Sequence, residues 1–89
     1  MNDEHIKYAR EVVGQDPMAT FLGIRVEEVA YAYCRLSLRL KPEYLNALDR
    51  AHGIAISAVI DQAVAVASNA TEYQALIVEL KINFLDAAA

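Results

Sequence analysis

The apolar positions at the start of the chain follow a helical period. Between residues 3 and 13 the apolar and small residues recur every three or four positions, at Ile6, Ala9, Val12 and Val13. This period predicts a short amphipathic helix, with acidic residues in its first turn. Gly14 is placed to end it.

A second short helix is predicted directly after the first. Asp16 precedes Pro17, and this pair is typical of an N-cap followed by proline at the first helical position. Gly23 is placed to end the helix. We expect Phe21 and Leu22, its last two residues, to plug one end of the core.

The period then changes to two. Ile24 and Val26 alternate with charged residues, and after a turn over residues 30–32 a second run alternates at Cys34, Leu36, Leu38 and Leu40. This pattern predicts a hairpin with one buried face, ended by Pro42, since proline cannot donate to a sheet. A third strand is predicted over Leu76 to Leu85, where apolar residues again occupy every second position.

A long apolar helix is predicted between the hairpin and the third strand. It begins at Gly53 and runs to about Asn69, and from Gly53 to Ala67 its only polar side chains are Ser57, Asp61 and Gln62. A helix this apolar is expected to be enclosed by other structure on most of its circumference. The order of elements predicts the α+β class, with an antiparallel sheet wrapped around one long central helix in a single domain over residues 1–89.

Composition narrows the functional classes. A chain of 89 residues with 56% hydrophobic residues has more apolar surface than one small core buries, so we expect a homo-oligomer, a dimer or tetramer. The formal net charge is −4 and no stretch gathers Lys and Arg, which argues against a nucleic-acid partner. Two histidines and one cysteine do not form a metal-ligand cluster, so no metal is expected.

We expect a cytoplasmic protein without a membrane partner. The N-terminus lacks the features of a secretory signal, and the longest apolar run is interrupted by Asp61 and Gln62. The single cysteine, Cys34, agrees with a reducing compartment. It falls on the apolar face of its strand, where a thiol stays protonated and acts as a small hydrophobe.

Four residues stand in a specific order around the start of the long helix. Asn46 lies in the preceding loop, His52 and Gly53 stand at the helix start, and Asp61 follows in its middle. With the segments FLGIRVEEV and VELKINFL, this order resembles the hotdog-fold thioesterases of the phenylacetate-degradation (PaaI-like) type. The resemblance implies hydrolysis of an acyl-CoA thioester, with CoA part of the substrate and no separate cofactor. Family members continue with further strands, so the chain is expected to be C-terminally short relative to them.

The resemblance also implies a role for each of these residues. The Gly53 N–H would bind the thioester carbonyl oxygen, Asp61 would be the base or nucleophile, and Asn46 would position water or substrate. His52 would order the loop. A helix N-terminus suits the first role, because its free N–H groups and partial positive charge stabilise an oxyanion. Further substrate contacts are proposed from basic and hydroxyl side chains: Lys41, Arg50, Ser57 and Lys81.

Ordinary structural roles remain open for the same residues. Gly53 could serve only the turn into the helix, His52 and Asn46 could be satisfied within the loop, and Asp61 could be a partly exposed helix position. A Ser57, His52, Asp61 triad fails on geometry, since the histidine stands at the helix start. The main alternative function is a non-catalytic acyl-CoA-binding or structural module.

Helix geometry adds one constraint. Gly53 and Asp61 are eight positions apart, which is roughly 12 Å along a helix axis. A base must reach the group that it activates directly or through one water. If both residues act on one carbonyl, they must therefore come from different subunits.

Overall fold

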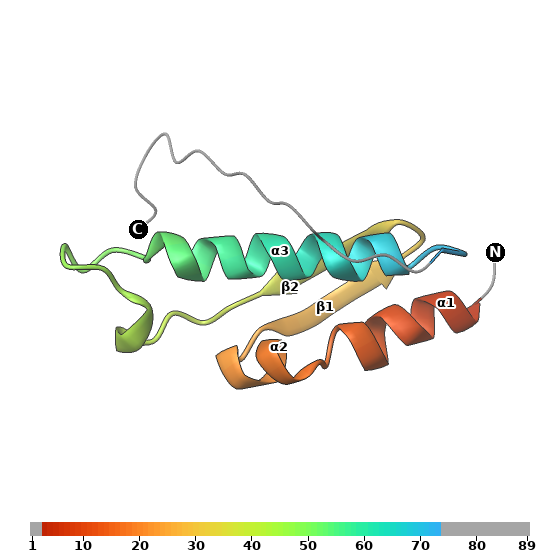
Figure 1. The fold of residues 1–89 in the computed structure, drawn as a ribbon, viewed down its shortest axis with the longest axis horizontal. Helices are drawn as coiled ribbons and strands as arrows, with labels where there is room; N and C mark the ends of the chain where they lie inside the picture. The colour runs from red at the N-terminus through yellow and green to blue at the C-terminus, as the bar shows by residue number, and fades with distance from the viewer. Residues whose placement is uncertain (1–2, 74–89) are drawn as a thin grey trace.

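The computed structural model describes residues 3–73. The predicted strand over Leu76 to Leu85 and the candidate Lys81 lie outside these residues. Within them the chain is α+β, as predicted, and a long helix runs along a two-stranded antiparallel sheet (Figure 1). The elements in chain order are α1 (Asp3–Tyr8), η1 (Ala9–Val13), α2 (Pro17–Leu22), β1 (Arg25–Ala30), β2 (Tyr33–Ser37), η2 (Pro42–Tyr44) and α3 (Gly53–Asn69).

The hairpin has one irregularity that sets its buried face. Arg25 pairs with Ser37 and Ala30 with Tyr33, and a bulge lies between Val26 and Glu28. The extra residue places Val26 and Val29 on the same side of the sheet, both packed in the core. The turn passes through Ala32, whose φ is 54° and whose N–H donates to the Ala70 carbonyl at 3.0 Å. The tip of the hairpin is thereby tied to the end of α3.

The second strand is shorter than its alternating pattern predicts. Hydrogen bonding ends at Ser37, because its partner Arg25 is the first residue of β1. Before Arg25, the chain bends away at Gly23, whose φ of 84° is left-handed. Within the described residues, Leu38 and Leu40 therefore make no strand-to-strand hydrogen bonds. Their side chains nevertheless lie on the same apolar side as Leu36.

The N-terminal helix changes its pitch halfway. The Gly14 N–H donates to the Ala9 carbonyl at 2.8 Å, five residues back, so η1 is π-helical. Ala9 is fully buried and Val13 packs against the core, but Val12 is 55% exposed. The predicted apolar face is thus wrong at Val12, because a wider turn changes the angular spacing of the side chains.

The second helix forms as predicted, but its last aromatic residue does not fill the core. The Asp16 carboxylate accepts the Ala19 N–H at 3.0 Å, and Pro17 occupies the first helical turn. Phe21 is 79% exposed, so its expected place in the core is wrong. A helix this short has one face against the protein, and here Ala19 and the half-buried Leu22 occupy it.

The described core lies where α3, the hairpin and the N-terminal helices meet. Its fully buried members are Ala9, Val66 and Ala70, joined by Val29. Gln62 also faces inward, and its amide donates to the Val13 carbonyl at 2.8 Å. This hydrogen bond satisfies a polar group that burial would otherwise penalise.

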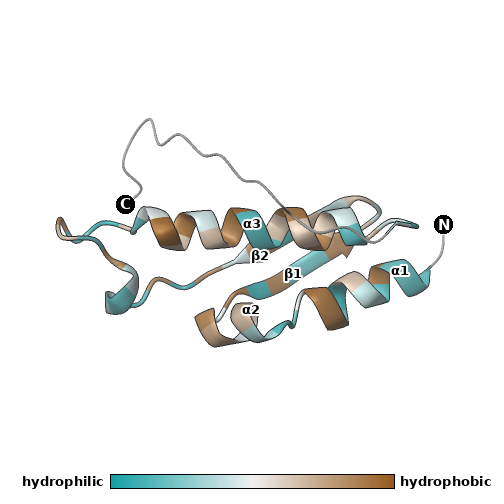
Figure 2. Cartoon of the chain, in the orientation of Figure 1, coloured by the Kyte–Doolittle hydropathy of each residue, from teal (hydrophilic) through white to brown (hydrophobic). Residues whose placement is uncertain are grey.

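None of the elements described between residues 3 and 73 covers the opposite face of α3. Figure 2 shows that α3 is apolar over most of its length, yet Ile54 is 74%, Val64 46% and Ile60 37% exposed, and Asp61 is exposed beside them. The hairpin and N-terminal helices, which pack on α3 among residues 3–73, cover only the other side. Apolar side chains at this density on one face are typical of a surface that packs against another subunit.

A first prediction concerns Gly14. A Cβ at this position would stand 2.6 Å from a Val26 methyl carbon and 2.7 Å from the Arg10 carbonyl oxygen. Since backbone cannot move aside without breaking the π turn, Gly14→Ala should lower the free energy of unfolding by about 1–3 kcal/mol. Urea unfolding measures this change. The nearby exposed Val12→Ala is the control and should change stability by less than about 0.5 kcal/mol; equal effects of the two variants would contradict the predicted close packing at Gly14.

Candidate active site

The loop before α3 is folded around the Asn46 side chain. Its Oδ1 accepts the Leu48 N–H at 2.9 Å and the Arg50 N–H at 3.1 Å, and its own N–H donates to the Arg50 carbonyl at 2.7 Å. Asp49 takes a left-handed φ of 58° within the loop. The Asn46 oxygen is thus used to hold the loop, while its amide NH₂ has no hydrogen-bond partner in the described range 3–73. That NH₂ is the group left to contact a bound molecule.

His52 is the N-cap of α3. Its Nδ1 accepts the Ile54 N–H at 3.0 Å, and its backbone N–H donates to the Tyr44 carbonyl at 2.7 Å. An accepting Nδ1 carries no proton, so the ring proton is on Nε2 in the neutral side chain. The histidine therefore fixes both the start of the helix and the end of the loop.

Gly53 is the first residue of α3, and its N–H lies at the exposed end of the helix. The next N–H along is capped by His52, but the Gly53 N–H has no partner among the residues that the structure describes. Four positions later, the Ser57 hydroxyl donates to the Gly53 carbonyl at 2.7 Å. An unpaired N–H at the positive end of a 17-residue helix is well suited to bind an anionic oxygen.

Asp61 does not approach Gly53 within one chain. Both belong to the same unbroken helix, eight positions apart, which corresponds to roughly 12 Å along the axis. Asp61 lies on the exposed face of α3, and within residues 3–73 it has neither an ion pair nor a hydrogen bond. The chain thus brings Asn46, His52 and Gly53 together at one end of α3, and holds Asp61 two turns away.

An apolar pocket opens beside the start of α3. It has a volume of about 300 Å³ and is lined chiefly by Leu22, Leu38, Tyr44, His52, Ala55 and Ala58. Sequence reasoning selected only His52 among these. Leu38 had the signal of an apolar strand position, whereas Tyr44, Ala55 and Ala58 belong to the site only because the loop and helix fold together.

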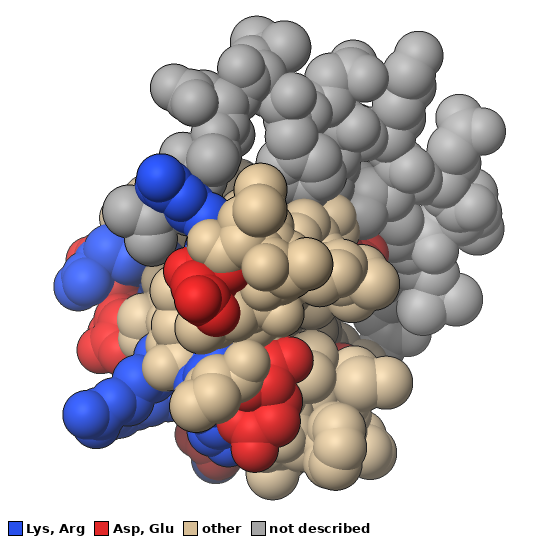
Figure 3. Space-filling model, turned by 90° about the vertical axis from the view of Figure 1, so that its left-hand side faces the viewer, with Lys and Arg blue, Asp and Glu red and all other residues tan. Residues whose placement is uncertain are grey.

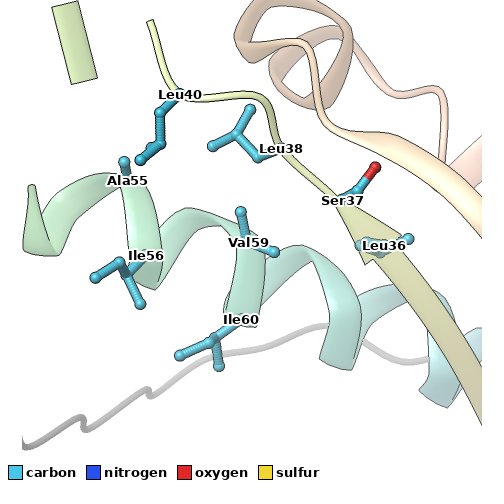
Figure 4. Close-up of a pocket in the computed structure, with 8 residues that line it drawn as sticks. All are labelled: Leu36, Ser37, Leu38, Leu40, Ala55, Ile56, Val59 and Ile60. Carbon is cyan, nitrogen blue, oxygen red and sulfur yellow. The ribbon is translucent and has the colours of Figure 1, made fainter. Parts of the chain in front are cut away.

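A second apolar cavity of about 250 Å³ adjoins the first along α3. Figure 4 shows Leu38, Leu40, Ala55 and Val59 directed into the space between the continuation of β2 and the helix. Leu38 and Ala55 line both cavities. These two residues therefore form the boundary between the pocket and this second cavity, which we call the groove.

Charged groups gather on one side of this end of the molecule (Figure 3). Figure 3 shows it from the side at which α3 begins, with basic side chains along one side and acidic side chains among them. Arg50 is exposed in the loop, and the Lys41 ammonium stands 5.7 Å from the centre of the Tyr44 ring. Both basic side chains are thus on the surface, and Lys41 lies beside Tyr44, which lines the pocket.

Cys34 is not part of this site. Its Sγ donates to the Ala63 carbonyl at 3.2 Å, and burial raises the pKa of the thiol. The raised pKa agrees with the sequence-based prediction that the thiol stays protonated. A second prediction is that Cys34 reacts slowly with alkylating reagents, since only the thiolate attacks them.

The rate of iodoacetamide labelling at pH 8 measures this property. Cys34 should react at least tenfold more slowly than a cysteine introduced at the exposed position 47 of a Cys34→Ser background. Equal rates for the two thiols would contradict a half-buried, protonated Cys34.

The described residues offer no competing metal site. In the range 3–73, no three side chains of the metal-binding types His, Cys, Asp and Glu come together closely enough to hold an ion. Within the same part of the chain, no helix has the length and apolar character needed to cross a membrane.

The chain is similar in sequence to a curated protein. A curated protein of Archaeoglobus fulgidus named "Putative esterase" is 34% identical over 73 residues, which are 82% of this chain and 47% of that protein. The chain therefore spans about half the length of the curated relative that it matches. No protein-family model matches the chain.

Two solved structures are closely similar in shape. The PaaI protein of E. coli, from the phenylacetic acid degradation operon, matches 97% of this chain and 62% of its own with a TM-score of 0.83 and 22% identity. A thioesterase family protein from Silicibacter pomeroyi matches 96% of this chain and 65% of its own with a TM-score of 0.84 and 24% identity. The α+β hotdog fold expected from the sequence is thus confirmed, and this chain has the fold of PaaI and of a thioesterase family protein.

Proposed function

We propose that the chain hydrolyses an acyl-CoA thioester to a free acid and CoA in the cytoplasm. The observation that carries the proposal is the unpaired Gly53 N–H at the N-terminus of α3, beside an apolar pocket of about 300 Å³. An oxyanion donor next to an apolar pocket is what hydrolysis of an apolar acyl thioester requires. The esterase name of the relative and the thioesterase name of one structure agree with this chemistry.

The proposed reaction uses Asp61 against a carbonyl bound at Gly53. As a general base, the Asp61 carboxylate takes a proton from water while the water oxygen attacks the thioester carbon. The carbonyl oxygen becomes an oxyanion that accepts the Gly53 N–H. When the tetrahedral intermediate collapses, the C–S bond breaks and CoA leaves as a thiolate that takes up a proton. Alternatively Asp61 attacks the carbon itself, the C–S bond breaks with release of the CoA thiolate, and water then hydrolyses the resulting anhydride to regenerate Asp61.

The two groups are proposed to come from two subunits. A separation of roughly 12 Å on one rigid helix is too long for direct contact with one carbonyl. The exposed face of α3 carries Asp61 together with Ile54 and Val64, so a second copy packed on this face buries apolar surface and brings its own Asp61 in. A two-fold dimer then holds two equivalent sites, and two such dimers form a tetramer.

The other candidates take supporting roles in this proposal. The Asn46 NH₂ is available to orient water or the carbonyl, because its oxygen is occupied by the loop. His52 positions Gly53 by capping the helix. Arg50 is proposed to meet the CoA phosphates, together with Lys81, which lies outside the described residues. Ser57 donates to the Gly53 carbonyl and keeps its lone pairs for a substrate contact.

A non-catalytic acyl-CoA-binding module is the second candidate function. Asp61 is solvent-exposed in the single chain, and a chain that did not pair on this face would keep the pocket but lack the base. Binding without turnover distinguishes this candidate.

The test is release of free CoA from a panel of acyl-CoAs, followed with a thiol reagent, by the purified protein at micromolar concentration. The proposed function predicts turnover at a rate that rises with the fraction of dimer and is lost in Asp61→Asn. Acyl-CoA binding without release of CoA at any concentration would contradict hydrolysis and favour the binding module.

A further inference from the structure

The pocket beside Gly53 is bounded by side chains that approach it from three directions. Leu22 comes from α2, Leu38 follows β2, and Ala58 comes from the second turn of α3. His52 and Ala55, which flank Gly53 closely in sequence, also line it. A carbonyl oxygen on the Gly53 N–H therefore places its acyl chain at the entrance to this pocket.

Tyr44 forms a wall of the pocket that is held by hydrogen bonds at both the backbone and the side chain. Its hydroxyl donates to the Leu22 carbonyl, so the side chain spans from the loop to the end of α2. Its N–H donates to the Lys41 carbonyl at 2.8 Å, and its own carbonyl accepts the His52 N–H at 2.7 Å. The Lys41 ammonium lies 5.7 Å from the ring centroid. With both ends of the residue bonded, the ring cannot swing aside at little energetic cost.

We propose that Tyr44 determines the acyl specificity of the enzyme by setting the maximum length of the acyl group in this pocket. This inference rests on the proposed thioester hydrolysis. A pocket of about 300 Å³ holds roughly ten non-hydrogen atoms at ~30 Å³ for each water-sized group. Leu38 and Ala55 bound it on the side of the neighbouring groove. Longer chains meet the Tyr44 ring, where the hydrogen bond to Leu22 keeps the wall closed.

The apolar lining of the pocket also selects against acidic acyl groups. Its lining is mostly aliphatic and aromatic. A second carboxylate on the substrate would lose its hydration on entering an apolar pocket. The substrate class is therefore a neutral, apolar acyl group of short to medium length.

The test has two measurements. The first is kcat/KM for straight-chain acyl-CoAs from acetyl to palmitoyl. The second is the affinity for the matching non-hydrolysable thioether analogues, measured with each pocket variant in an Asp61→Asn background. For the wild-type pocket, each added methylene should raise kcat/KM and affinity about fourfold until the pocket is full. Beyond that length both should fall. Tyr44→Ala should raise the ratio of dodecanoyl to hexanoyl at least tenfold, whereas Tyr44→Phe, which keeps the ring but loses the hydrogen bond to the Leu22 carbonyl, should raise it by a smaller factor.

A second variant guards against a Tyr44→Ala protein that does not fold. Ala58→Leu fills the same pocket from the helix and should shift the preference to shorter chains. An unchanged length profile in Tyr44→Ala or, if that protein is unfolded, in Ala58→Leu overturns the inference. If the substitutions change how the affinity for the thioether analogues depends on chain length, but no protein releases CoA, the proposed hydrolysis is contradicted and the role of Tyr44 in the acyl pocket is supported. Turnover with unchanged profiles supports hydrolysis and overturns the role of Tyr44, and absence of both binding and turnover overturns both.

Discussion

Gly53→Pro is expected to lower kcat/KM for thioester hydrolysis about 10²–10³-fold, while Gly53→Ala retains most of it. Proline lacks the N–H that we propose as oxyanion donor, and loss of one such donor typically has an effect of this size. Position 53 accepts proline without refolding. It is the first residue of α3, where proline is favoured. The preceding His52 has φ −69° and ψ 140°, the extended backbone that a residue before proline requires.

The comparison between the two variants separates the loss of the N–H donor from the steric effect of an added side chain. Alanine and proline both add a Cβ at the entrance to the pocket, but only proline removes the donor. Steady-state kinetics measures the difference, and circular dichroism with thermal melting checks that both variants keep the helix. Equal activity of the proline and alanine variants would contradict the oxyanion role of Gly53.

Asp61→Asn is expected to lower kcat/KM by about 10²–10⁴-fold with a melting temperature close to that of the wild type. The amide cannot accept a proton from water or attack the thioester, but it has nearly the same shape. Stability should persist because Asp61 is exposed and makes no ion pair in the described residues. Asp49→Asn is a matched control, since Asp49 is an exposed acid in a left-handed conformation that asparagine also accepts.

Kinetics of both variants over the same acyl-CoA panel gives the comparison. Asp49→Asn should keep its activity within about twofold, because it changes the net charge by the same amount at a position outside the site. Full turnover by Asp61→Asn would remove Asp61 from the mechanism.

The elements with strong local signals could be predicted from the sequence. Asp16 followed by Pro17 and the apolar run after Gly53 each identify a helix start correctly, since capping and periodicity are local effects. The errors arise where neighbours decide the outcome. Val12 turns outward because of a π turn, and β2 stops early because β1 offers no further partner.

The site divides in the same way. The order of Asn46, His52, Gly53 and Asp61 is visible in the sequence, and helix spacing predicts that the first three stand apart from the last. The pocket wall formed by Tyr44 and Leu22 depends on a contact between residues 22 positions apart, which no local pattern indicates. The exposure of Asp61 was one of two alternatives that the sequence left open, because an apolar helix does not reveal which of its faces another subunit covers.

The central claim is that one site is built from two subunits, and subunit mixing tests it directly. Gly53→Pro and Asp61→Asn are each expected to be inactive alone. In a mixed dimer, one site carries both changes and the other carries neither. Random exchange makes half of the dimers mixed, and half of their sites are intact, so about a quarter of wild-type activity should return. Activity that stays at the level of the single variants, after native mass spectrometry has confirmed mixed dimers, would contradict the shared site.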